Sequence, residues 1–223
     1  MSVTLVVFDC DGVLVDTERL AVGIEARALS ELGWPHTPEE MVARFMGKTS
    51  EAMLAEVESV IGSEATRFFD ERTTAEVHEL FGRELIAVPG AVDVVETLTR
   101  EGVSTCVASS GSHQKMRTTL GITGLFDLFD GRIFSASEVA HGKPAPDLFL
   151  HACAKMGGRP ESTVVIEDSV YGVRAAVSAG MTVYGFAGGL SPAEALEEAG
   201  AVVFHEMTEL FPLLGSRSKG APR

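Results

Sequence analysis

Residues 3–12 read VTLVVFDCDG, an apolar run that stops at two acidic residues and a glycine. A short run rich in β-branched residues that ends at a turn signal predicts a buried strand entering a loop. Ligands bind beyond the carboxyl ends of the strands in a parallel sheet. Asp9 and Asp11 stand at such an end, where their negative charges repel each other. A cation would relieve this repulsion, and carboxylate oxygens suit Mg²⁺; an ordinary acidic turn is the alternative.

The composition indicates a globular protein. The chain has 223 residues, of which 45% are hydrophobic and 22% charged, enough for one large domain or for a core with an insertion. The net charge of −14 argues against nucleic acid and anionic membranes as partners. An anionic substrate would therefore need local positive charge or a metal ion. We expect a monomer or a weak homodimer.

Cysteine usage and the first residues favour a cytoplasmic location. The three cysteines are scattered and form no CxxC pair, so neither a disulfide framework nor a zinc site is indicated. The first apolar run has no basic segment before it and reaches Asp9 within a few residues, which is too short for a signal peptide or a membrane span. The small, polar and basic segment 216–223 is expected to be disordered.

Hydrophobic periodicity separates two parts of the chain. Residues 17–81 show helical spacing without a convincing strand, interrupted at GKTS (47–50) and at 62–63. The sequence TPEE at 37–40 is a capping box with proline at the first helical position. We therefore predict an all-helical cap of about four helices over residues 17–87. Residues 1–16 and 88–223 are predicted to form the core.

Strands and helices alternate in the second part of the chain. Expected helices cover 91–100, 113–120, 147–156 and 170–179, and expected strands cover 104–108, 132–135, 163–166, 182–186 and 202–204. A second capping box, SPAE at 191–194, is expected to begin a helix that ends at Gly200. Alternation of this kind predicts right-handed βαβ units. The predicted fold class is therefore α/β, a doubly wound parallel sheet with an inserted helical cap.

Polar residues follow three further expected strands or lie near their ends. Ser109 and Ser110 precede a helix, where hydroxyl and backbone N–H groups could bind an anion, although an ordinary helix cap would look the same. Lys143 lies between glycine and prolines that restrict its backbone. Glu167 and Asp168 end the second strongly apolar strand and form a second candidate metal site, unless they simply face solvent.

The order of these motifs resembles that of the haloacid dehalogenase superfamily of phosphotransferases. DCDG at 9–12, then Ser109, then Lys143 followed by proline, then the acidic pair at 167–168 all lie at or near strand ends. The resemblance covers about residues 5–204. The helical insertion looks like the cap of the branch that contains β-phosphoglucomutase and many sugar-phosphate phosphatases. This resemblance implies a doubly wound core with a cap that closes over the site.

The resemblance also implies a role for each motif residue. Asp9 matches the nucleophile that becomes an aspartyl phosphate, and Asp11 matches the general acid/base. Ser109 matches the hydroxyl that binds the transferred phosphoryl group, with backbone N–H groups near Asp11 and Ser110 assisting it. Lys143 matches the lysine that neutralises both nucleophile and phosphate. These residues imply a Mg²⁺-dependent phosphatase acting on a small phosphorylated metabolite, most plausibly a sugar or sugar-acid phosphate.

The implied magnesium ligands come from the same strand ends. The carboxylates of Asp9 and Asp168 and the main-chain carbonyl of Asp11 match the protein ligands. Glu167 either binds the metal ion directly or stabilises the site without being a direct ligand. Water and phosphate would complete the octahedron that Mg²⁺ prefers.

Substrate specificity is expected in the cap. The break at 46–50 matches the substrate loop of related caps, and Arg44 and Lys48 could meet a second anionic group of the substrate. Both could equally be exposed charges near helix ends. Asp16 and Glu18 lie in the first linker, where they could accept substrate hydroxyls or only cap the helix.

Two basic residues follow Ser109 in the sequence. His113 and Lys115 belong to the helix expected at 113–120 and lie close to the candidate phosphate site. Because cationic side chains are usually exposed, we expect both to be residues of the helix surface, with a role as ligands in the site as the alternative.

Three other functions remain possible at this point. A phosphomutase of the β-phosphoglucomutase type is disfavoured, because residues 16–23 contain no histidine, with Ala21 at its place, and Ser50 replaces the loop arginine. Dehalogenation does not need an acid two residues after the nucleophile, so Asp11 argues against it. A non-catalytic phosphate-binding module is a remote alternative, because all motif residues are present. The individual substrate cannot be predicted from the fold.

Overall fold

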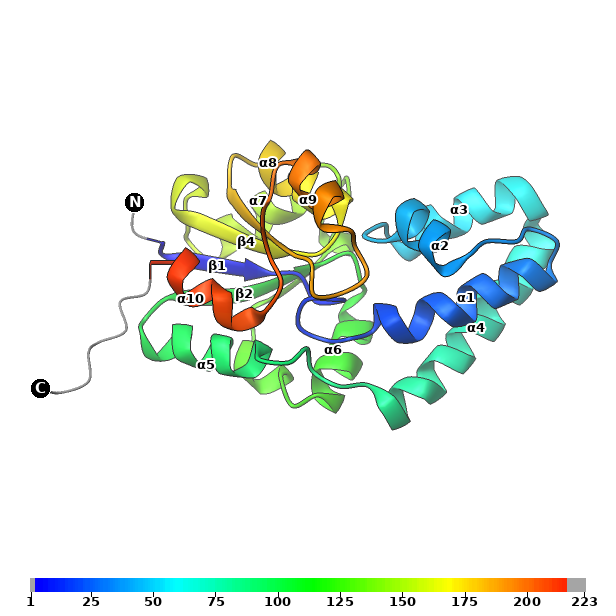
Figure 1. Cartoon of the computed structure of the whole chain (residues 1–223), viewed down its shortest axis with the longest axis horizontal. Coiled ribbons are helices and arrows are strands. Elements are labelled where there is room, and N and C mark those ends of the chain that lie inside the picture. Colours follow the sequence, from blue (N-terminus) through cyan, green and yellow to red (C-terminus); the bar gives the residue numbers. More distant parts are fainter. Residues whose placement is uncertain (1–2, 216–223) are drawn as a thin grey trace, which may run out of the picture.

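The computed structural model describes residues 3–215 and has two parts. A six-stranded sheet with helices on both faces forms the core, and four helices extend from one end of it (Figure 1). The predicted α/β fold with a doubly wound parallel sheet is confirmed. The helices of the insertion lie where the cap was predicted, while the division of the chain at residues 16 and 88 stays a prediction.

The sheet is parallel throughout and has the order β3-β2-β1-β4-β5-β6. Its strands are β1 (Leu5–Phe8), β2 (Ser104–Ser109), β3 (Ile133–Ser135), β4 (Thr163–Glu167), β5 (Thr182–Phe186) and β6 (Val202–Phe204). The central strand β1 is fully buried, which is why it reads as a continuous apolar run. Phe8 pairs with Val107 on one side and with Ile166 on the other. The polar residues that follow these strands therefore meet at one edge.

Helices cover the two faces of the sheet in two groups. One face carries α5 (Ala91–Arg100), α6 (His113–Ile122) and α10 (Leu210–Leu213), and the other carries α7 (Asp147–Lys155), α8 (Val170–Ser178) and α9 (Ala193–Ala199). Side chains of β1 alternate between these layers, with Val6 and Phe8 in the first apolar cluster and Leu5 and Val7 in the second. Short 3₁₀ turns occur at Phe126–Phe129, Ala136–Glu138, Pro160–Ser162 and Met207–Glu209.

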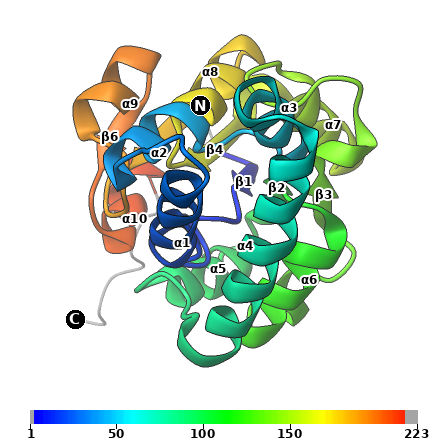
Figure 2. The ribbon, with the colours of Figure 1, turned by 90° about the vertical axis from the view of Figure 1, so that its right-hand side faces the viewer.

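The inserted helices have a small apolar core of their own. They are α1 (Glu18–Glu31), α2 (Pro38–Phe45), α3 (Ser50–Ile61) and α4 (Ser63–Glu84). The predicted capping box at the start of α2 is confirmed, because Thr37 Oγ1 accepts from Glu40 N while the Glu40 carboxylate accepts from Thr37 N. Figure 2 looks onto this helical part with the sheet behind it. The insertion therefore lies beyond the carboxyl end of β1.

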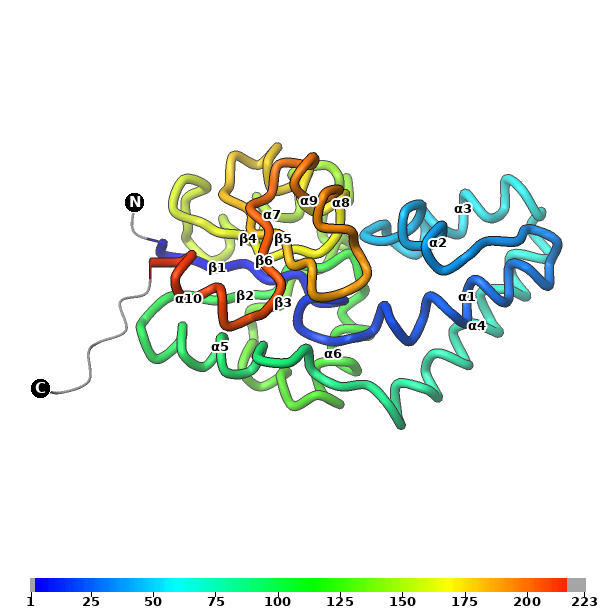
Figure 3. The backbone as a smooth tube through the Cα atoms, in the orientation of Figure 1, coloured from blue at the N-terminus to red at the C-terminus, as the bar shows by residue number. Residues whose placement is uncertain are grey.

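Two neighbouring connections join the insertion to the core (Figure 3). The backbone N–H of Asp16 donates to Ile86 O over 3.1 Å, and that of Val88 donates to Leu14 O over 2.9 Å. These bonds pair the segment that leaves the core with the segment that returns to it. The first residues of α1 are consequently held close to Asp9 and Asp11 in the preceding loop.

The structure corrects some details of the sequence-based expectations. The second capping box is wrong: α9 begins at Ala193 after Pro192, and no side chain caps it. Ser191 instead donates to the Met46 sulfur over 3.5 Å and so links the core to the insertion. The turn α10 was not predicted, and the expected disordered tail lies outside the described residues. Within residues 3–215, no helix combines the length and hydrophobicity needed to cross a membrane.

Candidate active site

Lys143 joins two carboxylates at the ends of different strands, Asp9 directly after β1 and Glu167 as the last residue of β4. Its ammonium donates to Asp9 Oδ1 and to Glu167 Oε1, both over 2.6 Å. All three residues are buried, and the Lys143 side chain is only 1% exposed. The strand ends and the loop before α7 therefore bring together three of the residues predicted from the sequence.

Burial and charge act in opposite directions on this group. Burial is the largest effect at Asp9 and raises the pKa of its carboxyl to about 7, with Glu167 and Asp11 adding to the rise and Lys143 opposing it. Burial alone would lower the pKa of Lys143, but attraction to Asp9 and Glu167 outweighs it and raises that pKa. Lys143 therefore remains cationic and favours the carboxylate form of Asp9 that a nucleophile requires.

Glu167 is held as a partner of Lys143. Its Oε2 accepts hydrogen bonds from Ser169 N over 2.6 Å and from Ser169 Oγ over 2.9 Å, while Oε1 accepts from Lys143. Both carboxylate oxygens are thus engaged by protein donors. This geometry favours the supporting position for Glu167 over direct binding of a metal ion.

Asp168 is the acidic residue that faces the first loop. Its Oδ2 is buried and, among residues 3–215, has no hydrogen-bond partner. Gly12 lies against it with φ +76°, and a Cβ atom there would come within 1.8 Å of Asp168 Oδ2. The glycine of the DCDG motif is therefore needed for the first loop to approach Asp168.

These residues fit a magnesium site built mainly from oxygen atoms. An unpartnered buried carboxylate oxygen is costly unless a cation neutralises it, and Asp168 supplies one beside Asp9 and the Asp11 backbone. Within the described range, no three His, Cys, Asp or Glu side chains are grouped as a metal centre. The predicted set needs no such group, because it combines two carboxylates with a main-chain carbonyl and completes Mg²⁺ with water and phosphate.

The side chain of Asp11 is fixed by two donors. Thr17 Oγ1 donates to Asp11 Oδ1 over 2.6 Å, and Lys115 Nζ donates to Asp11 Oδ2 over 2.9 Å. Lys115 is partly exposed on the helix, but its ammonium also reaches into the site. His113 does bind outside the site, pairing with Glu138 over 2.9 Å.

The loop after β2 forms another side of the site. Ser109 is buried, and its Oγ accepts from Gly111 N over 3.1 Å. Ser112 caps α6 by accepting from Lys115 N. The Ser110 hydroxyl donates to Gly47 O over 3.0 Å and so contacts the insertion. Phosphate binding by Ser109 and Ser110 stays a prediction.

A small cavity of about 50 Å³ lies between these elements and the insertion. It is lined by Asp9, Asp11, Glu18, Met46, Gly47, Lys48, Ser50, Ser109, Ser110, Gly111, Lys115, Lys143 and Asp168. Gly47 has φ +84°, and a Cβ there would meet Ser169 Oγ at 2.3 Å, so a glycine permits this close approach. The break at residues 46–50 is thus seated directly over the predicted catalytic residues.

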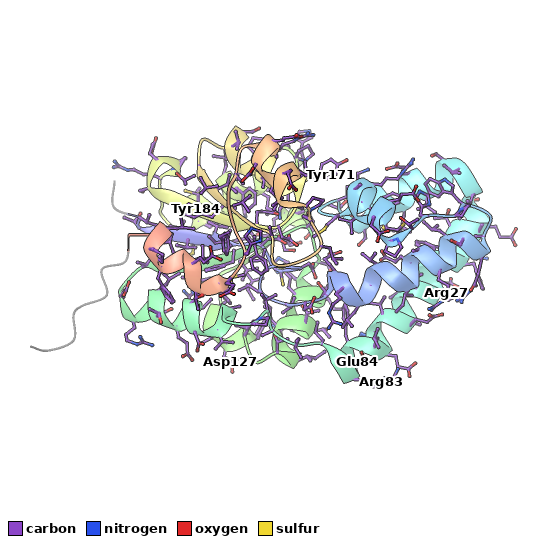
Figure 4. All side chains as sticks on the ribbon, viewed as in Figure 1. Arg27, Arg83, Glu84, Asp127, Tyr171 and Tyr184 are labelled. Carbon is purple, nitrogen blue, oxygen red and sulfur yellow. The ribbon has the colours of Figure 1, made fainter. Side chains whose placement is uncertain are left out.

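The four cap and linker candidates are placed differently. Lys48 lines the cavity while its Nζ pairs with Glu56 over 2.6 Å and lies 5.5 Å from the ring of Tyr171. Figure 4 shows Tyr171 on the side of the core that faces the insertion. Arg44 also pairs with Glu56 but stacks over Trp34 at 4.8 Å and does not line the cavity. Lys48 is therefore the better placed of the two basic residues.

The acidic candidates lie at the first linker. Glu18 lines the small cavity, and burial, with a smaller contribution from Asp11, raises the pKa of its carboxyl to about 8. Asp16 pairs with Arg19 over 2.7 Å and lines a larger neighbouring cavity of about 480 Å³. Asp16 is thus absent from the cavity that holds Asp9.

A family model for haloacid dehalogenase-like hydrolases matches residues 3–180. The chain belongs to this family. An Escherichia coli 6-phosphogluconate phosphatase is 32% identical over 81% of each chain, and a Thermotoga maritima phosphorylated carbohydrates phosphatase is 32% identical over 94% of this chain and 97% of its own. The structure of a conserved haloacid dehalogenase-like protein from Agrobacterium tumefaciens is 35% identical, has a TM-score of 0.82, and covers 98% of this chain and 100% of its own. These relatives support a phosphoric monoester hydrolase.

Proposed function

We propose that this hydrolase is a Mg²⁺-dependent phosphatase of small phosphorylated carbohydrates that works through an aspartyl phosphate on Asp9. The observation that carries the proposal is the buried bridge from Lys143 to Asp9 and Glu167, placed beside Asp11, Ser109 and Asp168 around one cavity. Phosphoryl transfer depends mainly on positioning and on neutralising charge. This arrangement supplies both within an otherwise acidic protein.

Asp9 would begin the reaction by attacking phosphorus. A new bond forms between a carboxylate oxygen of Asp9 and phosphorus, and the bond between phosphorus and the leaving oxygen breaks. Asp11 donates its proton to that oxygen, so the alcohol departs uncharged. Lys143 and the donors of the Ser109 loop hold the phosphoryl oxygens during transfer.

Asp11 would then act as a base in the second half of the reaction. Its carboxylate accepts a proton from water as the water oxygen attacks phosphorus. The bond between phosphorus and Asp9 breaks, which restores the Asp9 carboxylate and releases inorganic phosphate. Because one side chain serves as acid and then as base, its position relative to Asp9 is decisive.

Asp9, Asp168 and the Asp11 carbonyl would hold Mg²⁺, whose charge would offset the repulsion between the nucleophile and the phosphate. Removing divalent cations with excess EDTA is expected to reduce phosphate release by at least about a hundredfold, because charge stabilisation supplies much of the catalysis. Added Mg²⁺ should restore it. Calorimetric titration of the EDTA-treated protein with MgCl₂ should show binding that Asp168→Asn weakens, whereas full activity in EDTA would contradict the assignment.

The proposed substrate class rests on the relatives and on the cavity. Two relatives act, by their names, on 6-phosphogluconate and on phosphorylated carbohydrates. Lys48 and Glu56 place a donor group and a hydrogen-bond acceptor close to the cavity that holds the predicted phosphate site. Sugar and sugar-acid phosphates carry hydroxyl or carboxylate groups that such a pair can bind.

Lys48→Met is expected to raise the KM for a phosphorylated sugar acid at least about tenfold, because one charge-assisted hydrogen bond is worth roughly 1.5–3 kcal/mol. The kcat should change little, since Lys48 does not contact Asp9 or Asp11. Arg83→Met is the matched control, as Arg83 lies on the insertion 65% exposed and away from the cavity (Figure 4). Equal KM values for Lys48→Met and the wild type would remove Lys48 from the substrate site.

A phosphate-release screen tests the proposed function. The panel contains phosphosugars, phosphorylated sugar acids, 2-phosphoglycolate, glycerol phosphate and nucleotides, each with and without Mg²⁺. We expect the highest kcat/KM among sugar or sugar-acid phosphates. Conversion of β-glucose 1-phosphate to the 6-phosphate without release of phosphate would indicate a mutase instead, and no turnover of any ester would support a binding module.

A further inference from the structure

Lys115 is an unexpected member of the site and has no role in the chemistry described above. It lies on α6, 104 residues after Asp11, and its ammonium donates to Asp11 Oδ2 over 2.9 Å. Thr17 donates to the other oxygen of the same carboxylate over 2.6 Å. The two contacts come from different elements, one in the core and one in the linker to the insertion, so together they fix the rotation of the carboxylate.

The charges around Lys115 are predominantly acidic. Burial alone would lower the pKa of Lys115, but attraction to Asp11 and Glu18 outweighs it, so the net shift is upward and Lys115 remains cationic. Burial raises the pKa of Glu25 on α1, and the positive charge of Lys115 makes this rise smaller. Because its ammonium is already paired with the Asp11 carboxylate, Lys115 is less free to bind another anion. Its position instead suits the support of Asp11.

We infer that Lys115 is a positioning residue for the proposed acid/base Asp11, and this inference rests on the proposed phosphatase function. As Asp11 gives its proton to the leaving oxygen, negative charge develops on its carboxylate. The Lys115 ammonium, already within hydrogen-bond distance of Oδ2, stabilises that charge without rearrangement. Thr17 and Lys115 also keep the carboxylate aimed at the position of the leaving oxygen.

A positioning role of Lys115 predicts a dependence of kcat/KM on the leaving group that a general structural role would not produce. Aryl phosphates of similar shape, such as p-nitrophenyl and phenyl phosphate, differ mainly in how much the leaving oxygen needs a proton. The kcat/KM reports steps up to departure of the phenol and so isolates the acid role of Asp11. Lys115→Met should lower kcat/KM about a hundredfold for phenyl phosphate but tenfold or less for p-nitrophenyl phosphate, since acid catalysis supplies about 10²–10⁴-fold.

Three variants accompany this test. Lys115→Gln should show the same trend as Lys115→Met, and Lys115→Arg, which keeps a cationic donor, should return the leaving-group dependence toward that of the wild type. Arg117→Met removes a cation from an exposed position on the same helix, where Arg117 stacks over Phe126, and should match the wild type. The Lys115 side chain is 40% exposed, so these changes leave the core intact.

The outcomes separate this inference from the proposed function. An equal fall in kcat/KM for every aryl ester in Lys115→Met and Lys115→Gln would overturn the role of Lys115. Damage to phosphate binding would lower kcat/KM for all esters alike. The role of Lys115 would also be overturned if Lys115→Arg lowered kcat/KM for phenyl phosphate, relative to p-nitrophenyl phosphate, as strongly as Lys115→Met does. Absence of phosphatase activity in the wild type would instead contradict the proposed function itself.

Discussion

Asp9→Asn should abolish phosphate release, with a fall in kcat of more than about a thousandfold, as expected when a nucleophile is removed. The amide keeps the shape of the side chain but cannot attack phosphorus as a carboxylate does. Lys143 keeps its ion pair with Glu167 in this variant, so its buried ammonium still has a counter-charge and the fold should persist. Turnover by stopped-assay phosphate release and secondary structure by circular dichroism would measure the two effects separately.

Asp127→Asn is the matched control for this change. Asp127 is exposed on the core, away from the cavity (Figure 4), and its substitution removes the same charge without touching the site. Activity of the Asp127 variant should equal that of the wild type. Retention of wild-type turnover by Asp9→Asn would exclude Asp9 as the nucleophile.

Lys143→Met is expected to lose both activity and stability. The substitution leaves the carboxylates of Asp9 and Glu167 buried without the cation that joins them. Breaking a buried ion pair by removing one partner typically lowers the free energy of unfolding by roughly 3–5 kcal/mol. Urea denaturation followed by fluorescence would measure this loss, and phosphate release would fall together with it because nothing then neutralises the nucleophile and phosphate.

A double variant identifies the cause of that instability. Lys143→Met combined with Glu167→Gln removes one of the two stranded charges and should recover part of the lost stability, but it should not recover activity. Lys155→Met, at an exposed position at the end of α7, should behave as the wild type. Wild-type stability of the single Lys143→Met variant would show that the bridge contributes nothing to the fold.

Local sequence patterns were sufficient to predict the sheet and the main strand ends. The apolar run of β1 and the acidic residues after it predict a buried strand that enters a loop, because burial on both faces produces a continuous apolar strand. Parallel pairing then places the residues after β1, β2 and β4 at one edge. Lys143 was found by its restricted Gly/Pro surroundings rather than by periodicity.

Contacts between distant segments could not be predicted in the same way. Lys115 lies on a helix whose rotation relative to Asp11 depends on packing against the sheet, so the contact of this partly exposed side chain with Asp11 could not be predicted. Ser191 was assigned to a helix cap, yet the helix begins after Pro192 and the hydroxyl contacts Met46 of the insertion. Arg44 and Lys48 are close in sequence, and only the seating of the 46–50 loop over the core distinguishes them.

Rapid acid quenching during turnover of a ³²P-labelled substrate would detect the proposed covalent bond between Asp9 and the transferred phosphoryl group. We expect transient label on the peptide that contains Asp9. Hydroxylamine should remove this label, because it cleaves acyl phosphates, and Asp9→Asn should show no label. Asp11→Asn should retain the label longer, because it lacks the base that activates water. Phosphate release without any labelled protein at any time, or label on a different residue, would show that no phosphoryl group is carried by Asp9.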